Sequence, residues 1–134
     1  EFSAGLTDNV DLEVDVSSDL STINVDPVHL SQVLGNLCQN GTRYSMKNIG
    51  EPKVTIAAYK DESSHDVHMD VIDYGAGVDK ELVQNLFEPF YTTESTGTGL
   101  GLYLSRELCE ANHARLNYYP LSQGGSCFRI SFVQ

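Results

Sequence analysis

The sequence contains no tryptophan, only four prolines, and eight lysine and arginine residues against 19 aspartates and glutamates. Its formal net charge of −11 repels polyanions, so we expect no direct binding of DNA or RNA. This charge does not exclude a nucleotide ligand, because a metal ion can neutralise phosphates locally. Long apolar runs are missing as well: no stretch approaches the roughly 18 residues of a membrane span, and nothing resembles a signal peptide. We therefore expect a cytoplasmic location, with no membrane contact by these residues.

Cysteine is scarce, and its placement argues against a disulfide framework. Cys38, Cys109 and Cys127 are odd in number, far apart and without a C-x-x-C pair. Each has apolar neighbours, which predicts buried free thiols in a reducing compartment. The 134 residues, with a hydrophobic content of 40%, suit one core of ordinary size. We expect residues 1–134 to form a single domain.

Alternating apolar residues predict five strands. The expected strands span 11–16, 53–60, 66–72, 115–119 and 126–133. The first should be half-buried through Leu12, Val14 and Val16. The second and third flank a short polar stretch, which is typical of a hairpin.

Helical spacing predicts two long helices. The first begins at a capping aspartate, Asp26, followed by proline, and runs to about Ser45. The second runs from about Gly99 to Ala111, and a short helix is expected at 79–87. The inner face of the second long helix is expected to carry Leu100, Tyr103, Leu104, Leu108 and Ala111. Together these elements indicate an α+β fold, with one mixed, mostly antiparallel sheet and helices packed on one of its faces.

The first long helix carries a polar stripe beside its apolar face. Asn36, Asn40 and Arg43 lie on one side of a helix, within about 60° of one another at ~100° per residue. An amide oxygen can bind Mg²⁺, and a guanidinium can pair with phosphate. This stripe is consistent with a metal-phosphate ligand, and equally with a solvated helix face.

A second motif, Asp73-Tyr74-Gly75-Ala76-Gly77, directly follows a strand. The carboxylate at the strand end could accept a hydrogen bond from an exocyclic amine, and glycines permit a close backbone approach. The alternative is an ordinary glycine turn after a strand.

A third motif, Gly97-Thr98-Gly99-Leu100-Gly101, opens the second long helix. Backbone N–H groups at a glycine-rich helix start form an anion site. The motif is neither a dinucleotide fingerprint nor a P-loop, because leucine stands at position 102 and no Gly-Lys-Ser/Thr follows. A flexible loop leading into a helix is the simpler reading.

In their order and spacing, these motifs and the apolar stretch 86–91 resemble the N, G1, F and G2 boxes of the GHKL ATP-binding family. The resemblance runs from Asp26 to the C-terminus and is nearest to the histidine kinase branch. It implies a two-layer α/β sandwich, the Bergerat fold, with ATP held between helices and a flexible lid. Stretches 110–116 and 124–130 further resemble the sensor kinases that control type IV pilin transcription.

The resemblance also implies roles for individual residues, with Asn36, Asn40 and Arg43 as the catalytic set. Asn40 corresponds to the asparagine that binds Mg²⁺, while Asn36 and Arg43 correspond to residues near the phosphates. Tyr44 corresponds to the aromatic residue that packs on adenine, and Asp73 to the aspartate that reads its amino group.

The remaining implied contacts come from the glycines and the lid. Gly75 and Gly77 would let the base approach. Phe87 and Phe90 would lie at the base of the lid. The expected phosphate loop comprises Gly97, Thr98, Gly99, Leu100 and Gly101. Two positions depart from the family pattern: Glu94 stands where a lysine is common, and Gly41 where alanine is usual.

Three functions share this fold, and position 36 separates two of them. The family's hydrolases carry a glutamate one turn before the metal-binding asparagine, whereas Asn36 is an amide and cannot act as a general base. The resemblance therefore favours a kinase that binds Mg-ATP and transfers the γ-phosphoryl group to a histidine. The alternatives are an ATPase and an ATP-dependent conformational switch without efficient transfer.

The expected partner is a dimerisation domain of the same kinase that carries the acceptor histidine. No histidine of this sequence has the Glu/Asp and proline context of an acceptor helix. A response regulator is expected as an indirect partner, and the parent protein is expected to be anchored in the inner membrane.

Overall fold

The computed structural model describes residues 11–18, 22–89 and 101–133. Its strands are β1 (Asp11–Val16), β2 (Lys53–Lys60), β3 (Val67–Asp73), β4 (Ala114–Pro120) and β5 (Ser126–Phe132). Its helices are α1 (Pro27–Ile49), α2 (Lys80–Val83) and α3 (Gly101–Ala111). The expected elements are therefore present in the expected order.

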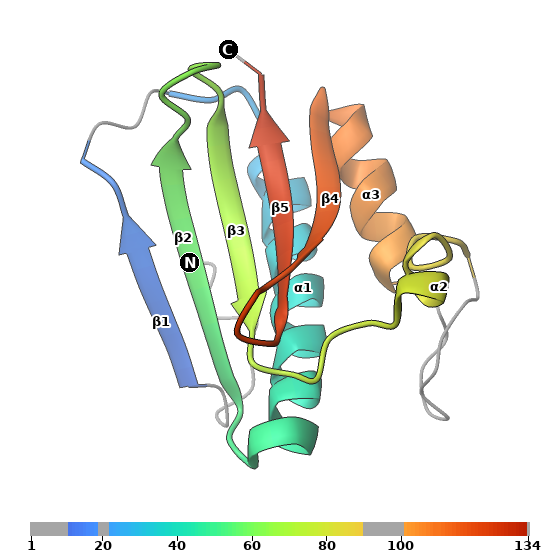
Figure 1. Ribbon diagram of the computed structural model, residues 1–134. Helices are drawn as coiled ribbons and strands as arrows, with labels where there is room; N and C mark the ends of the chain where they lie inside the picture. The colour runs from blue at the N-terminus through green and yellow to red at the C-terminus, as the bar shows by residue number, and fades with distance from the viewer. Residues whose placement is uncertain (1–10, 19–21, 90–100, 134) are drawn as a thin grey trace.

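The strands form one five-stranded sheet in the order β1-β2-β3-β5-β4. The β1–β2 pair is parallel, and the other three pairs are antiparallel. Helices α1 and α3 pack against each other and cover one face of this sheet (Figure 1). The predicted α+β fold with helices on one face is confirmed.

Helix α1 begins and ends where its capping residues require. The side chain of Asp26 accepts a hydrogen bond from the backbone N–H of Val28 at 2.9 Å, which satisfies a free donor of the first turn. At the other end Gly50 takes the left-handed conformation, with φ 73°. The helix therefore runs one turn beyond the predicted end at Ser45, and this extra turn contains Asn48.

The predicted inner face of α3 is partly wrong, although Leu108 does pack against the core. Ser105 and Cys109 are the buried residues of this helix, while Leu104 is 47% exposed and Ala111 is exposed. Small side chains let α3 approach α1 closely, and Asn36 of α1 donates to the Ser105 hydroxyl at 3.4 Å. Choosing the face by its large apolar residues finds Leu108 correctly, but it misses the buried Ser105 and Cys109 and includes the exposed Leu104.

The first strand is also less buried than predicted. Val14 is 55% exposed and Val16 is 58% exposed, although both lie on the helix-facing side of the sheet. The cause is position: β1 pairs with β2 at the edge of the described sheet, beyond the strands on which α1 packs.

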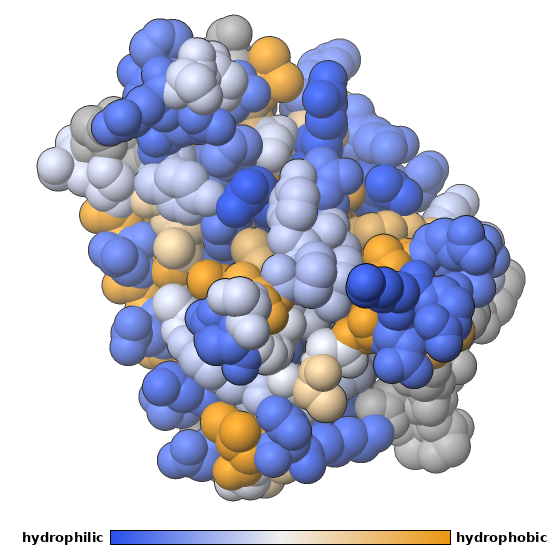
Figure 2. All heavy atoms as spheres, in the orientation of Figure 1, coloured by the Kyte–Doolittle hydropathy of each residue, from blue (hydrophilic) through white to orange (hydrophobic). Residues whose placement is uncertain are grey.

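The sheet face that the helices leave uncovered carries a polar network. Arg129 donates from Nε to Asp70 Oδ1 at 2.8 Å and from Nη2 to Asp70 Oδ2 at 3.2 Å. The Tyr59 hydroxyl donates to the same carboxylate at 2.8 Å. Figure 2 views this face, where hydrophilic and hydrophobic residues are mixed. Paired polar side chains allow strands to face water on one side.

All three cysteines are buried free thiols, as predicted. Burial raises the pKa of Cys38 and Cys127 to about 12 and that of Cys109 to about 11, so the unreactive protonated form prevails. Within the described ranges, no helix combines the length and apolar character needed to cross a membrane.

Candidate functional site

The polar stripe of α1 lies where this helix meets α3. Asn36 and Asn40 are half-buried, and Arg43, one turn further, is exposed. The Arg43 guanidinium donates a hydrogen bond to the Asn40 amide oxygen. Asn36 is held from the other side by Ser105, one turn into α3. The helix thus presents two amides and a guanidinium together, which is the arrangement expected from the sequence.

Asp73 ends β3 and is buried, with 2% of its surface exposed. Its Oδ1 accepts a hydrogen bond from the Gly75 N–H at 2.9 Å. Burial raises the pKa of this carboxyl to about 6, partly offset by hydrogen bonds from the backbone N–H groups of Gly75 and Ser126. The site therefore contains a carboxyl group that is shielded from water and can accept a donor from a ligand.

The turn after Asp73 packs directly on α1. A Cβ atom at Gly75 would lie 2.7 Å from Tyr44 Cβ and 3.0 Å from Asp73 Oδ1, so no larger residue fits there. Gly77 has φ 87°, a conformation that favours glycine. The structure thus brings Tyr44, Asp73 and Gly75 into one cluster, and these are positions to which the family resemblance assigns contacts with adenine.

Gly41 marks the close approach of α1 to the sheet beneath this cluster. A Cβ at this position would lie 3.2 Å from both Asp73 Cβ and Val54 Cγ2. This crowding is a physical reason for glycine at a helical position that usually prefers alanine.

Phe87 lies on the α3 side of the site. Its ring packs edge-to-face on Phe128 with 6.2 Å between centroids, and the Arg106 guanidinium lies 4.3 Å from its centroid. Gly101 opens α3, and a Cβ there would meet no atom within 4 Å. Five predicted site residues and Glu94 lie outside the described residues: Phe90, Gly97, Thr98, Gly99 and Leu100.

Gly125 and Ser126 also adjoin Asp73. From the sequence, Gly125 was predicted only as part of a turn and Ser126 only as the start of a strand. Asp73 and Ser126 are directly opposed across β3 and β5. A Cβ at Gly125 would lie 2.4 Å from the Asp73 carbonyl oxygen, and Gly125 has φ 87°. The available signal was the Gly124-Gly125 pair, which we interpreted only as a hairpin connection.

The chemistry of the donor set fits Mg²⁺. Among the described residues there is no cluster of three or more histidine, cysteine, aspartate or glutamate side chains. Mg²⁺ does not need such a cluster, because it keeps several waters and commonly takes one or two protein oxygens plus substrate phosphates. The amide oxygen of Asn40 is a hard donor of this type, and Arg43, which donates to it, would supply a counter-charge for a bound phosphate.

The raised pKa of Asp73 makes stability depend on pH. Between its ordinary value of 3.8 and its folded value of about 6, the folded state holds a proton that the unfolded chain has lost. Stability therefore falls as pH rises through this window. A shift of this size amounts to about 3 kcal/mol, fully expressed above roughly pH 7.

Asp73→Asn removes this ionisation. We expect the unfolding free energy of the variant, relative to wild type, to rise by about 2–3 kcal/mol between pH 4 and pH 7. Urea denaturation across this range measures the effect, with Asp79→Asn at an exposed position as the control. A difference between Asp73→Asn and wild type that stays constant with pH would contradict a buried, raised carboxyl.

The chain is similar to known sensor kinases over nearly all its length. Sensor protein kinase PilS of Pseudomonas aeruginosa is 47% identical over 99% of this chain and 25% of PilS. Signal transduction histidine-protein kinase AtoS of Escherichia coli is 31% identical over 96% of this chain and 20% of AtoS. The chain thus spans a quarter or less of the length of these relatives.

Solved structures show the same fold. The nucleotide-free catalytic domain of histidine kinase ThkA matches with a TM-score of 0.73 and 28% identity, over 93% of this chain and 79% of that one. Full-length ShkA in complex with AMPPNP matches with a TM-score of 0.75 and 26% identity, over 92% of this chain and 25% of ShkA.

The family assignment rests on most of the chain. Residues 25–134 match the family described as histidine kinase-, DNA gyrase B-, and HSP90-like ATPase. The matched region contains α1 with its polar stripe, the buried Asp73 and the glycine turn that follows it. This chain belongs to the histidine kinase-, DNA gyrase B-, and HSP90-like ATPase family, as the resemblance of its motifs had predicted.

Proposed function

We propose that this chain is the catalytic domain of a sensor histidine kinase, which binds Mg-ATP and transfers the γ-phosphoryl group to a histidine on a separate dimerisation domain. Residues 1–134 would form this one domain within a longer protein. The similarity to PilS and AtoS and the fold shared with the ThkA catalytic domain support this proposal. The observation that supports it most is Asn36 in the polar stripe of α1. This residue is an amide where the hydrolases have a glutamate, and its nitrogen donates a hydrogen bond to the Ser105 hydroxyl.

The adenine end of the site would be formed by the Asp73 cluster. Asp73 would accept a hydrogen bond from the adenine amino group, and Tyr44 would pack on the base. Gly75 and Gly77 keep the backbone turn free of side chains at this point. A buried carboxyl discriminates strongly against a base without the matching donor, because the unmatched polar group stays desolvated.

The phosphate end would be formed by α1 and the start of α3. Asn40 would bind Mg²⁺, which neutralises phosphate charge, while Arg43 and Asn36 would contact phosphate oxygens. Phe87 would support the base of the lid, and Phe90, Thr98, Gly99, Leu100 and Gly101 would complete the enclosure. These residues orient the γ-phosphate and balance its charge, which is the main requirement of phosphoryl transfer.

The missing base favours histidine over water as the acceptor. A neutral imidazole nitrogen carries a nucleophilic lone pair and forms an N–P bond as the bond to ADP breaks. Water has to lose a proton to do the same, and an amide at position 36 cannot take that proton. The acceptor domain is then the direct partner, and a response regulator receives the phosphoryl group from it. The resemblance of stretches 110–116 and 124–130 to kinases that control type IV pilin transcription leads us to propose a parent kinase that is anchored in the inner membrane and regulates pili.

Asn40→Ala tests the Mg²⁺ part of this proposal. We expect the variant to bind ATP at least about tenfold more weakly in the presence of Mg²⁺. The reason is that loss of the amide oxygen as a ligand of the metal ion costs roughly 1–3 kcal/mol of binding free energy. Its affinity for ATP without Mg²⁺ should stay close to wild type. Calorimetry with and without Mg²⁺ measures both values.

Gln39→Ala, at the exposed neighbouring position of α1, is the matched control and should keep the wild-type affinities. Wild-type protein that binds ATP equally with and without Mg²⁺ would refute the proposed metal site.

A further inference from the structure

Tyr74, between Asp73 and Gly75, has its main chain held at both polar groups by α1. Its N–H donates to Ser45 Oγ at 2.9 Å. Its carbonyl accepts from Asn48 Nδ2 at 3.0 Å. Ser45 and Asn48 are three positions apart, so they lie on the same face at the end of the helix. One peptide segment is therefore clamped by two neighbouring side chains of α1.

The Ser45 hydroxyl has a single proton, which determines the direction of its two hydrogen bonds. Its hydroxyl donates to the carbonyl of Lys53, the first residue of β2, at 2.7 Å. A hydroxyl has one proton, so its remaining capacity is to accept, and the Tyr74 N–H fills it. Ser45 is 0% exposed, so loss of its oxygen would leave buried polar groups without a partner. This side chain ties the helix, the start of β2 and the turn together.

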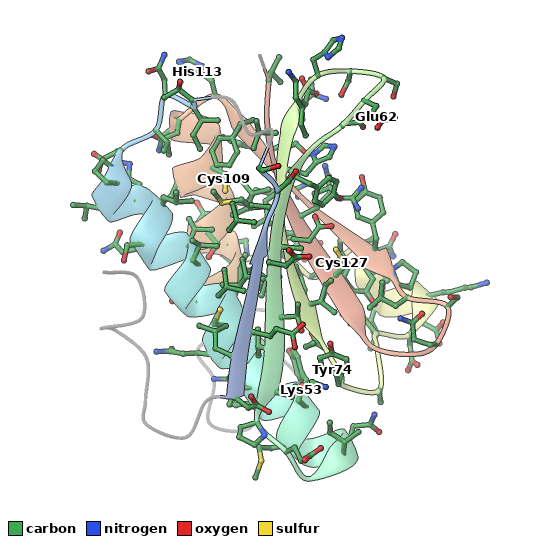
Figure 3. The ribbon with its side chains drawn as sticks, turned by 90° about the vertical axis from the view of Figure 1, so that its left-hand side faces the viewer. Lys53, Glu62, Tyr74, Cys109, His113 and Cys127 are labelled. Atoms are coloured by element: carbon green, nitrogen blue, oxygen red, sulfur yellow. The ribbon has the colours of Figure 1, made fainter. Side chains whose placement is uncertain are left out.

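The ring of Tyr74 is held from the other side of the sheet. Its hydroxyl lies 2.9 Å from Thr55 Oγ1, and Lys53 Nζ lies 4.8 Å from the ring centroid. Figure 3 shows the labelled Tyr74 and Lys53 near each other at the end of the sheet where α1 also ends. Tyr74 is therefore fixed through its main chain on one face and its ring on the other.

We propose that Ser45, Asn48 and Tyr74 are positioning residues that set the base specificity of the site, an inference that rests on the proposed function. Asp73 and Gly75 flank Tyr74, so a displacement of the clamped peptide moves the carboxylate and the turn that packs on Tyr44. Recognition of an adenine amino group depends on the position of one carboxylate oxygen within a few tenths of an ångström. The clamp holds that oxygen in place before the base arrives.

The test measures ATP and GTP affinities of the 134-residue chain by calorimetry, together with thermal unfolding. The variants are Ser45→Ala, Asn48→Ala and Ser45→Thr. We expect Ser45→Ala and Asn48→Ala to lower the affinity for ATP by about tenfold while the affinity for GTP changes less than about twofold. Ser45→Thr keeps the hydroxyl and should retain the wild-type ratio. Met46→Ala, at an exposed position of the same turn, is the control.

A purely structural role for the clamp predicts a different result. The unfolding temperature would fall in Ser45→Ala and Asn48→Ala, but the ratio of ATP to GTP affinity would stay at the wild-type value, and this would overturn the inference. If Ser45→Ala does not fold, Asn48→Ala decides alone, because Asn48 lies on the exposed surface. Wild-type protein without any preference for ATP would instead refute the proposed function itself.

Discussion

Gly125→Ala adds a single carbon atom and should lower the free energy of unfolding by about 3–4 kcal/mol. The new Cβ would lie 2.4 Å from the Asp73 carbonyl oxygen, and the residue would have to keep φ near 87°. Relief of the clash requires β3 and the β4–β5 connection to separate at Asp73. Urea denaturation measures the loss, and calorimetry on the folded fraction should show weakened ATP binding.

Gly124→Ala is the matched control for this prediction. Gly124 has φ 96°, but a Cβ there would meet no atom within 4 Å. Gly124→Ala should therefore have the backbone strain without the clash, and we expect its free energy of unfolding to fall by about 1–2 kcal/mol. An equal loss in the two variants would show that Gly125 does not pack on Asp73 as described.

The second large effect concerns the chemistry at α1. Asn40→Ala should reduce phosphoryl transfer to an acceptor histidine by at least about a hundredfold, because charge neutralisation by the metal is worth several kcal/mol in the transition state. Gln39→Ala again provides the control at an exposed neighbouring position. Transfer by Asn40→Ala at the wild-type rate would exclude Asn40 from the metal site.

Asn36→Glu tests whether the absence of a carboxylate at position 36 of α1 limits the hydrolysis of ATP. A general base typically contributes about 10²–10⁴-fold, but a carboxylate beside triphosphate also repels it. We expect a modest rise in hydrolysis per bound ATP, with weaker ATP binding and reduced transfer to histidine. Asn36→Ala removes the amide without adding a carboxylate, so a rise in hydrolysis in both variants would contradict this explanation.

The elements of the fold were predictable because their signals are local. Alternation gave the strands, and Asp26 gave the start of α1, where its side chain caps the helix as expected. The face of α3 was not predictable in the same way. It depends on where α1 passes, since Ser105 and Cys109 are buried while the larger Leu104 is exposed.

The site shows the same division between local and long-range information. Asn36, Asn40 and Arg43 share a helix, so their spacing alone brought them together. Gly125 and Ser45 act on Asp73 and Tyr74 across long stretches of sequence, and their contacts follow from strand pairing and helix placement. Nothing in the local pattern of a glycine pair or a helical serine reveals such a neighbour. Gly41 likewise acquires its reason only from the nearness of Asp73 and Val54.

The fate of the γ-phosphate of labelled ATP distinguishes a histidine kinase from a hydrolase. The wild-type chain is mixed with Mg-ATP and a separately supplied acceptor-helix domain from a related kinase. We expect an acid-labile label on the acceptor histidine, no label on the chain itself and only slow release of inorganic phosphate. Rapid phosphate release without any labelled acceptor would place the chain among the hydrolases of its family and contradict the proposed kinase activity.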